Sequence, residues 1–167
     1  YSKLNFLVIG YGSIGRQHVE ILKKFGIKNI NILTSQKKVG KNFFQGLQKI
    51  KKLNPDYIII ASPTTSHFKH LSFIERNFKN KSILVEKPLF DKFKKLTIRN
   101  NRVVIGYNMR FHPILQKIKE IVKNKKIIYA SSVCSSYMPD WRKNIDYKKS
   151  ISAKKKFGGG IRLELSH

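Results

Sequence analysis

Residues 4–15, LNFLVIGYGSIG, decide the fold, because a mostly apolar run passes directly into a glycine-rich turn. The apolar run predicts a buried β-strand, and residues 13–25 carry apolar side chains at helical spacing. The glycines of such a turn permit a tight bend, close approach of a ligand to the backbone and close packing of helix on strand. The N–H groups that begin the helix can then hold phosphates. The turn predicts a dinucleotide site, against the alternative of a glycine turn without a ligand, at Gly10, Tyr11, Gly12, Ser13, Ile14 and Gly15.

Beyond this turn, short apolar runs alternate with longer amphipathic stretches. The runs are continuously apolar, as strands are when helices cover both faces of a parallel sheet. We therefore predict an α/β protein of the Rossmann type, with a doubly wound parallel sheet. The expected strands are residues 4–9, 30–33, 57–61, 82–85, 103–105 and 126–133. The expected helices are residues 13–25, 41–53, 66–78, 89–96 and 113–122.

The chain is strongly basic, with 35 Lys and Arg against 9 Asp and Glu and a formal net charge of +26. Such a field attracts nucleic acid, anionic membranes and phosphorylated ligands. The lysines are spread from end to end, however, and no RNA-binding aromatic motif or arginine-rich arm accompanies them. We interpret the charge as background composition and expect no nucleic-acid or membrane partner. The alternative, a nucleic-acid binder, predicts an affinity that falls steeply with salt.

The single cysteine, Cys134, excludes a disulfide within the chain and a cysteine-based metal site. This cysteine content fits a reducing cytoplasm, where we expect the protein. No apolar run approaches the roughly 18 residues of a membrane-spanning helix. The sequence shows no metal-ligand cluster, so we expect no bound metal.

The residues after the second predicted strand bear on which dinucleotide is bound. An acidic residue about 20 positions after the glycine motif usually holds the ribose 2′-hydroxyl of NAD. Here Thr34, Ser35, Gln36 and Lys37 stand in that place, followed by a second lysine. Hydroxyls, an amide and lysines suit a 2′-phosphate, so we expect NADP to be preferred and NAD to be the alternative. The competing interpretation is that these lysines are ordinary surface residues.

Two further segments follow predicted strands at the carboxyl edge, where open α/β sheets bind ligands. Ser62, Pro63 and Thr64 follow the third strand, and His67 comes soon after them. We expect His67 to pack or hydrogen-bond rather than to act as a base. Glu86-Lys87-Pro88 follows the fourth strand, and it either holds a cation near a reacting hydroxyl or forms an exposed salt bridge of little energetic value. The cofactor-binding candidates at this edge are therefore Ser62, Pro63, Thr64, His67, Glu86 and Lys87.

The order of these motifs resembles the Gfo/Idh/MocA oxidoreductase family. The glycine motif, the serine-proline turn with its histidine and the Glu-Lys-Pro turn are followed by GYNMRFHP at residues 106–113 and GGGIRLELSH at residues 158–167. The resemblance implies a Rossmann domain, a second α+β domain with a large open sheet, and hydride transfer at hydroxyl or keto groups of sugars and cyclitols. Residues 137–142, YMPDWR, resemble members that act near sugar modification, which favours a nucleotide-activated or amino sugar.

From Ser135 on the sequence is polar and rich in Lys and Tyr, and we place a domain boundary near Asn124. With the resemblance, residues 1–124 would form the cofactor domain, and residues 125–167 would be the incomplete start of the substrate domain. We therefore expect either a longer parent protein or a truncated product, and a homo-oligomer at full length. A dinucleotide-binding sensor without catalysis and an inactive fragment are the alternatives.

Specific roles follow from the resemblance. Lys87 would be catalytic near the nicotinamide and the substrate hydroxyl, in a turn where a cis Lys87-Pro88 bond is expected. His167 would be the general base or acid. Asn108 and Arg110 would line the substrate cleft. Glu164 would also face substrate, although the family usually carries Asp four residues before this histidine rather than Glu three residues before it.

Overall fold

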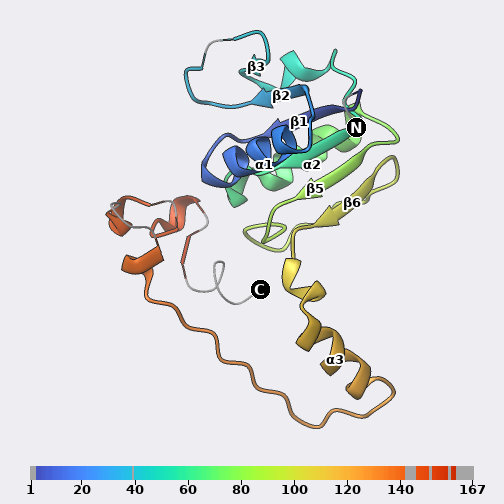
Figure 1. Ribbon diagram of the computed structural model, residues 1–167, viewed down its shortest axis with the longest axis vertical. Helices are drawn as coiled ribbons and strands as arrows, with labels where there is room; N and C mark the ends of the chain where they lie inside the picture. The colour runs from blue at the N-terminus through green and yellow to red at the C-terminus, as the bar shows by residue number, and fades with distance from the viewer. Residues whose placement is uncertain (1–2, 39, 142–145, 151, 158, 161–167) are drawn as a thin grey trace.

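The computed structural model describes residues 3–38, 40–141, 146–150, 152–157 and 159–160. Its largest element is a parallel β-sheet, which lies in the upper part of Figure 1. The six strands of the sheet run in the order β3-β2-β1-β4-β5-β6, and each neighbouring pair is parallel. The chain builds outward from β1 to one edge, returns to the middle, and builds to the other edge. This is the doubly wound Rossmann-type sheet that the sequence predicted. The strands are β1 (Asn5–Ile9), β2 (Asn29–Leu33), β3 (Phe43–Phe44), β4 (Tyr57–Ile60), β5 (Ser82–Val85) and β6 (Arg102–Ile105).

Two helices, α1 (Ser13–Lys24) and α2 (Thr64–Asn77), pack on opposite faces of the sheet. The first of them ends where the sequence predicted, since Gly26 takes a φ of 77° and its N–H donates to the carbonyl of Lys23 at 2.9 Å. A third helix, α3 (Pro113–Val122), lies beyond the end of β6 (Figure 1). Short 3₁₀ turns are η1 (Leu47–Ile50), η2 (Asn108–Phe111), η3 (Met138–Trp141), η4 (Tyr147–Lys149) and η5 (Lys155–Phe157).

The core has two layers, one on each face of the sheet. Successive side chains of a strand point to opposite faces, so the central strands supply both layers, and this explains their continuously apolar sequences. The layer under α2 contains Leu7, Ile9, Leu33, Ile50, Ile58, Ile60, Leu71, Ile74, Phe78, Ile83 and Val85. The layer under α1 contains Val8, Val19, Ile27, Ile30, Ile32 and Ile59.

The half of the α1 face formed by β4, β5 and β6 is less well covered. Tyr57 and Val104 are 40% and 44% exposed there, and Phe6 stacks on Tyr57 with ring centroids 5.0 Å apart. Right-handed crossovers explain the difference, because strands added in one direction place all their connections on the same face. Both connections of this half therefore run on the α2 face, where Leu89 and Phe90 pack on the core.

The helix predicted for residues 41–53 is wrong. This segment instead holds β3, whose Phe43 and Phe44 pair with Ile32 and Leu33 of β2, and the 3₁₀ turn η1. Gly46 separates them with a φ of 89°, a backbone conformation that a continuous helix cannot contain.

The helix predicted for residues 89–96 is also wrong, because this segment is irregular. A helix would have grouped Leu89, Phe93 and Leu96 on one face, but the side chain of Phe93 is 96% exposed. Phe90 instead meets Phe68 of α2 edge to face, with centroids 5.3 Å apart. The contact between Phe90 and α2 therefore sets the path of this segment, and the segment does not form a helix.

The strand predicted for residues 126–133 is absent as well. Those residues form no helix or strand, and Ile128 and Val133 are more than nine-tenths exposed. A strand needs a hydrogen-bonding neighbour, and the described residues provide none beside this segment. The domain boundary near Asn124 stays a prediction. Among the described helices, none is both long and apolar enough to cross a bilayer.

Candidate cofactor and substrate site

The glycine turn joins β1 to α1 at the carboxyl edge of the sheet. Gly10 has a φ of 101°, and an added Cβ would lie 2.6 Å from the backbone of Ala61. A Cβ on Gly15 would lie 2.0 Å from the carbonyl oxygen of Gly10. Both glycines are therefore required by the packing of the protein itself. A Cβ on Gly12, by contrast, would meet no atom within 4 Å, so the space over this residue is open to a ligand.

The first turn of α1 faces this open space. Its N-cap residue, Gly12, makes no side-chain capping bond, and the first turn contains no acidic residue. The positive end of the helix dipole is thus available to an anion. Arg16 adds a charge there, with its guanidinium 5.9 Å from the centre of the Tyr11 ring. Arg16 directly follows Gly15, and this position is the signal in the sequence that could have identified it as a site residue.

The residues after β2 lie beside the glycine turn. The side chain of Gln36 donates to the carbonyl of Tyr11 at 3.1 Å, and the backbone N–H of Gln36 donates to the hydroxyl of Thr34 at 3.1 Å. Thr34 is only 6% exposed, whereas Ser35, Gln36 and Lys37 are exposed. Of the residues expected to hold a 2′-phosphate, Thr34 is therefore the least accessible.

The turn after β4 is held by two histidines of α2. The Oγ of Ser62 lies 2.8 Å from Nδ1 of His70, and the carbonyl oxygen of Ser62 lies 2.8 Å from Nε2 of His67. Burial, followed by the charges of His67 and Lys69, lowers the pKa of His70 from 6.5 to about 4. His70 is therefore neutral at physiological pH. His70 was not among the predicted site residues, although it follows His67 by three positions on α2.

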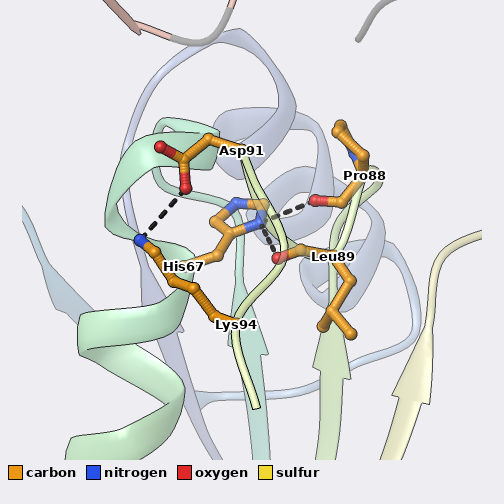
Figure 2. A network of polar contacts seen from close by, with 5 residues as sticks. All are labelled: His67, Pro88, Leu89, Asp91 and Lys94. Carbon is orange, nitrogen blue, oxygen red and sulfur yellow. Dashed lines mark hydrogen bonds and ion pairs between the residues drawn. The ribbon is translucent and has the colours of Figure 1, made fainter. Parts of the chain in front are cut away.

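His67 also reaches the turn after β5 (Figure 2). Its Nδ1 lies 3.0 Å from the carbonyl oxygen of Pro88 and 3.2 Å from that of Leu89. The side chain is 1% exposed. These contacts support the packing role that the sequence favoured for His67 over a role as base. Beside it, Lys94 and Asp91 form an ion pair at 3.1 Å (Figure 2).

The turn after β5 carries Lys87, and its Lys87-Pro88 bond is cis, as expected. The carboxylate of Glu86 accepts a hydrogen bond from Nε2 of His18 at 2.7 Å. Burial alone would raise the pKa of Glu86, but the hydrogen bond from His18 and the charges of His18 and Lys87 outweigh it and hold this pKa below its usual value. Glu86 thus stays a carboxylate, and it pairs with His18 rather than forming the exposed bridge to lysine that the sequence left open.

The expected substrate residues Asn108 and Arg110 lie in η2, directly after β6, and both are exposed. The guanidinium of Arg110 lies 5.9 Å from the centre of the Tyr107 ring. They share a sheet edge with Lys87, since β5 and β6 are neighbours. Glu164 and His167 lie outside the described residues.

The residues at this edge fit a dinucleotide. The open space over Gly12, the uncapped start of α1 and the cation of Arg16 suit a pyrophosphate. The turns after β4 and β5 lie next along the edge, because β1 pairs with β4 and β4 with β5. Among the described residues, no three potential metal ligands gather.

Comparisons with known proteins agree with this geometry. A family model described as an oxidoreductase family with an NAD-binding Rossmann fold, GFO_IDH_MocA, matches residues 4–98. Two proteins of Bacillus subtilis, both oxidoreductases by name, are similar: YteT is 24% identical over 86% of this chain and 35% of its own length. YrbE is 25% identical over 95% of this chain and 49% of its own length, so the chain spans half or less of these relatives.

Solved structures show the same fold. The WlbA dehydrogenase of Thermus thermophilus, in complex with NAD and UDP-GlcNAcA, superposes with a TM-score of 0.57 at 24% identity, over 74% of this chain and 48% of that one. The WlbA dehydrogenase of Bordetella pertussis, in complex with NADH and UDP-GlcNAcA, gives a TM-score of 0.57 at 16% identity, over 72% and 42% of the two chains. With the family model covering more than half of its residues, the chain belongs to the Gfo/Idh/MocA family of oxidoreductases with an NAD-binding Rossmann fold.

Proposed function

We propose that the protein is an NAD(P)-dependent oxidoreductase that moves hydride between the nicotinamide and a hydroxyl or keto group of a sugar derivative. The observation that carries this proposal is the placement of Lys87. It lies at the ligand-binding edge, two strands from the open glycine turn, and the residues on either side of it are held by histidines. A lysine whose neighbours in the chain are fixed by such contacts suits catalysis better than it suits passive cofactor binding.

When bound, the nicotinamide supplies the hydride chemistry. Gly10 to Gly15 and Arg16 would hold the pyrophosphate, and Ser62, Pro63 and Thr64 would border the cofactor. Lys87 would stabilise the negative charge that develops on the substrate oxygen. His167 would accept the hydroxyl proton in oxidation and return it in reduction. Because Glu86 remains ionised, it would not serve as the acid.

NADP is our preferred cofactor, with NAD as the alternative. No carboxylate stands at the end of β2, and Ser35 and Lys37 are exposed there. A 2′-phosphate gains charge-assisted hydrogen bonds from such a set, whereas a 2′-hydroxyl finds no acidic acceptor in it. The family description and the WlbA complexes name NAD, so the preference is specific to the residues of this chain.

For the substrate we propose a nucleotide-activated sugar acid or amino sugar. The WlbA neighbour binds UDP-GlcNAcA, which carries a diphosphate and a carboxylate. Arg110, exposed beside Asn108 at the same edge, is a donor for such anions, and the net charge of +26 would attract them. Glu164 would contact a sugar hydroxyl. We further propose that the full-length protein is a homo-oligomer of the reducing cytoplasm.

The direct test is turnover of the full-length protein with NADP or NAD and UDP-GlcNAcA, followed by the absorbance of the reduced cofactor. Lys87→Ala should lower turnover by orders of magnitude while cofactor binding persists. Lys92→Ala, an exposed lysine five positions further on, is the matched control and should leave turnover unchanged. Unchanged turnover in Lys87→Ala would refute the role of the lysine. Cofactor binding without hydride transfer to any of a broad panel of sugars would favour a sensor.

A further inference from the structure

We propose that His67 is a pH-dependent positioning residue for Lys87. With a proton on both ring nitrogens, His67 holds the turn after β4 and the turn after β5 together, and loss of one proton releases the turn that carries Lys87. The consequence for catalysis rests on the proposed function, because the release affects turnover only if Lys87 is catalytic.

The ring of His67 faces carbonyl oxygens on both sides. Its Nε2 lies 2.8 Å from the oxygen of Ser62. Its Nδ1 lies 3.0 Å from the oxygen of Pro88 and 3.2 Å from that of Leu89 (Figure 2). A carbonyl oxygen can only accept a hydrogen bond, so each ring nitrogen needs a proton to make its contact favourable. Because a neutral imidazole has a single N–H, this geometry is that of a ring protonated on both nitrogens.

The burial of His67 makes the second proton important. The side chain is 1% exposed, so the surrounding solvent does not supply a missing hydrogen bond. On a neutral ring, the lone pair of one nitrogen would point at a carbonyl oxygen, and these two groups repel each other. Turning the ring by 180° would bring carbon atoms to the places of both nitrogens. A neutral ring must therefore give up its contact on one side.

The distances indicate which side is given up. The contact with Ser62 is the shortest of the three, whereas Nδ1 shares its proton between the oxygens of Pro88 and Leu89. Ser62 is also held a second time, since its Oγ lies 2.8 Å from Nδ1 of His70. We therefore expect Nε2 to keep its proton and Nδ1 to lose it. The turn after β5 is then freed directly beyond the cationic Lys87.

The charges around the ring oppose the second proton. His67 lies close to the N-terminus of α2, where the helix dipole is positive, and Lys69 adds a like charge on the same helix. Burial, followed by the charge of His67, lowers the pKa of His70 to about 4, so the two neighbouring rings are not charged together at neutral pH. On the segment after β5, Asp91 is paired with Lys94 at 3.1 Å, and their charges offset each other. The second proton thus depends mainly on the carbonyl oxygens that it contacts.

The test is an NMR titration of the whole chain between about pH 5 and 8, the range in which histidines commonly titrate. Long-range correlations from the carbon-bound ring protons report the protonation of each nitrogen of His67. Carbonyl-carbon shifts report the contacts of Ser62, Pro88 and Leu89. As the pH rises, Nδ1 alone should lose its proton, the signals of Pro88 and Leu89 should shift with the same midpoint, and that of Ser62 should stay. The exposed His112 is the internal control, and its titration should not move these signals.

His67→Gln is the matched variant, because its amide carries N–H donors but does not titrate in this range. It should abolish the pH-dependent shifts of Pro88 and Leu89, whereas His112→Asn should keep them. The titration of the wild-type chain decides alone if His67→Gln does not fold. Four results would overturn the inference: carbonyl shifts that do not follow the ring, an equal shift at Ser62, a single protonated nitrogen at the acid end, or two protons kept to the alkaline end.

NADH binding to the wild-type chain is measured separately, so that the two proposals can fail independently. Absent NADH binding with the expected titration of His67 would contradict the proposed function but not the pH-dependent contact. NADH binding without that titration would contradict the positioning role alone.

Discussion

Nδ1 of His67 lies 3.0 Å from the carbonyl oxygen of Pro88, so a buried side chain of α2 holds the turn that carries Lys87. The same ring contacts the carbonyl of Ser62. The imidazole of His67 therefore contacts both the turn after β4 and the turn after β5. Figure 2 shows its contact with the turn after β5.

Replacing His67 by Phe should lower the free energy of unfolding by about 1–3 kcal/mol, because a buried carbonyl oxygen loses its N–H donor while most of the volume is kept. Urea denaturation measures this difference. Lys69→Ala, an exposed position two residues further along α2, is the control and should change stability by less than about 0.5 kcal/mol. Equal stability of His67→Phe and wild type would show that the ring only fills space.

His70 should make stability depend on pH between 6.5 and about 4, because folding lowers its pKa from the first of these values to the second. The unfolded state takes up a proton there while the folded state does not, so stability is complete above pH 6.5 and falls as the pH falls toward 4. His70→Asn should remove this part of the slope in urea denaturation across that range. The exposed variant His112→Asn should keep it. A slope unaffected by His70→Asn would contradict the lowered pKa.

Glu75 should stabilise the fold above its titration range. Burial alone would raise its pKa, but the backbone N–H groups of Arg99 and Asn100, at 2.8 and 2.7 Å, and the amide of Asn101 hold that pKa below the usual 4.5. We expect Glu75→Gln to lower the free energy of unfolding by about 1–3 kcal/mol at neutral pH. Because the pKa of Glu75 is lowered in the folded state, its contribution to stability is lost on acidification. The difference in free energy of unfolding between variant and wild type should therefore shrink below pH 4.5.

The exposed Glu120→Gln is the control for that comparison, since Glu120 pairs only with Lys117 at the surface among the ion pairs of the described residues. Chemical denaturation at a series of pH values gives both curves. If the difference in free energy of unfolding between Glu75→Gln and wild type stays constant down to low pH, the carboxylate is not the stabilising form.

Cofactor choice should depend on the lysines after β2. NADPH should bind more tightly than NADH, and the double variant Lys37→Ala, Lys38→Ala should weaken NADPH about tenfold with little effect on NADH. Calorimetric titration with each cofactor measures this. Lys125→Ala, another exposed lysine outside the site, is the control. A loss shared equally by both cofactors would indicate general charge rather than a 2′-phosphate pocket.

Local signals were sufficient for most of the fold. Each strand of the sheet except β3 was predicted from its run of apolar residues, and α1 and α2 followed from helical periodicity. The errors arose where tertiary contacts decided the backbone. The two residues of β3 are too few to give a recognisable strand pattern. The path of residues 89–96 depends on the contact between Phe90 and Phe68 of α2.

The candidate site divides in the same way. The glycine turn and Lys87 were visible because each lies within one short motif. His18 and Glu86 were individually visible, but their contact spans 68 positions and leaves no local trace. His70 was overlooked because a histidine on a helix face carries no signal until its partner, Ser62, is known.

The measurement that tests the account most directly compares Gly12→Ala with Gly15→Ala. An added methyl at Gly12 meets no protein atom within 4 Å, whereas at Gly15 it would lie 2.0 Å from a backbone oxygen. We predict that Gly12→Ala keeps the melting temperature of wild type but weakens NADH and NADPH binding at least about tenfold, while Gly15→Ala lowers the melting temperature itself. Unweakened cofactor binding in a folded Gly12→Ala chain would contradict the claim that this turn is a dinucleotide site.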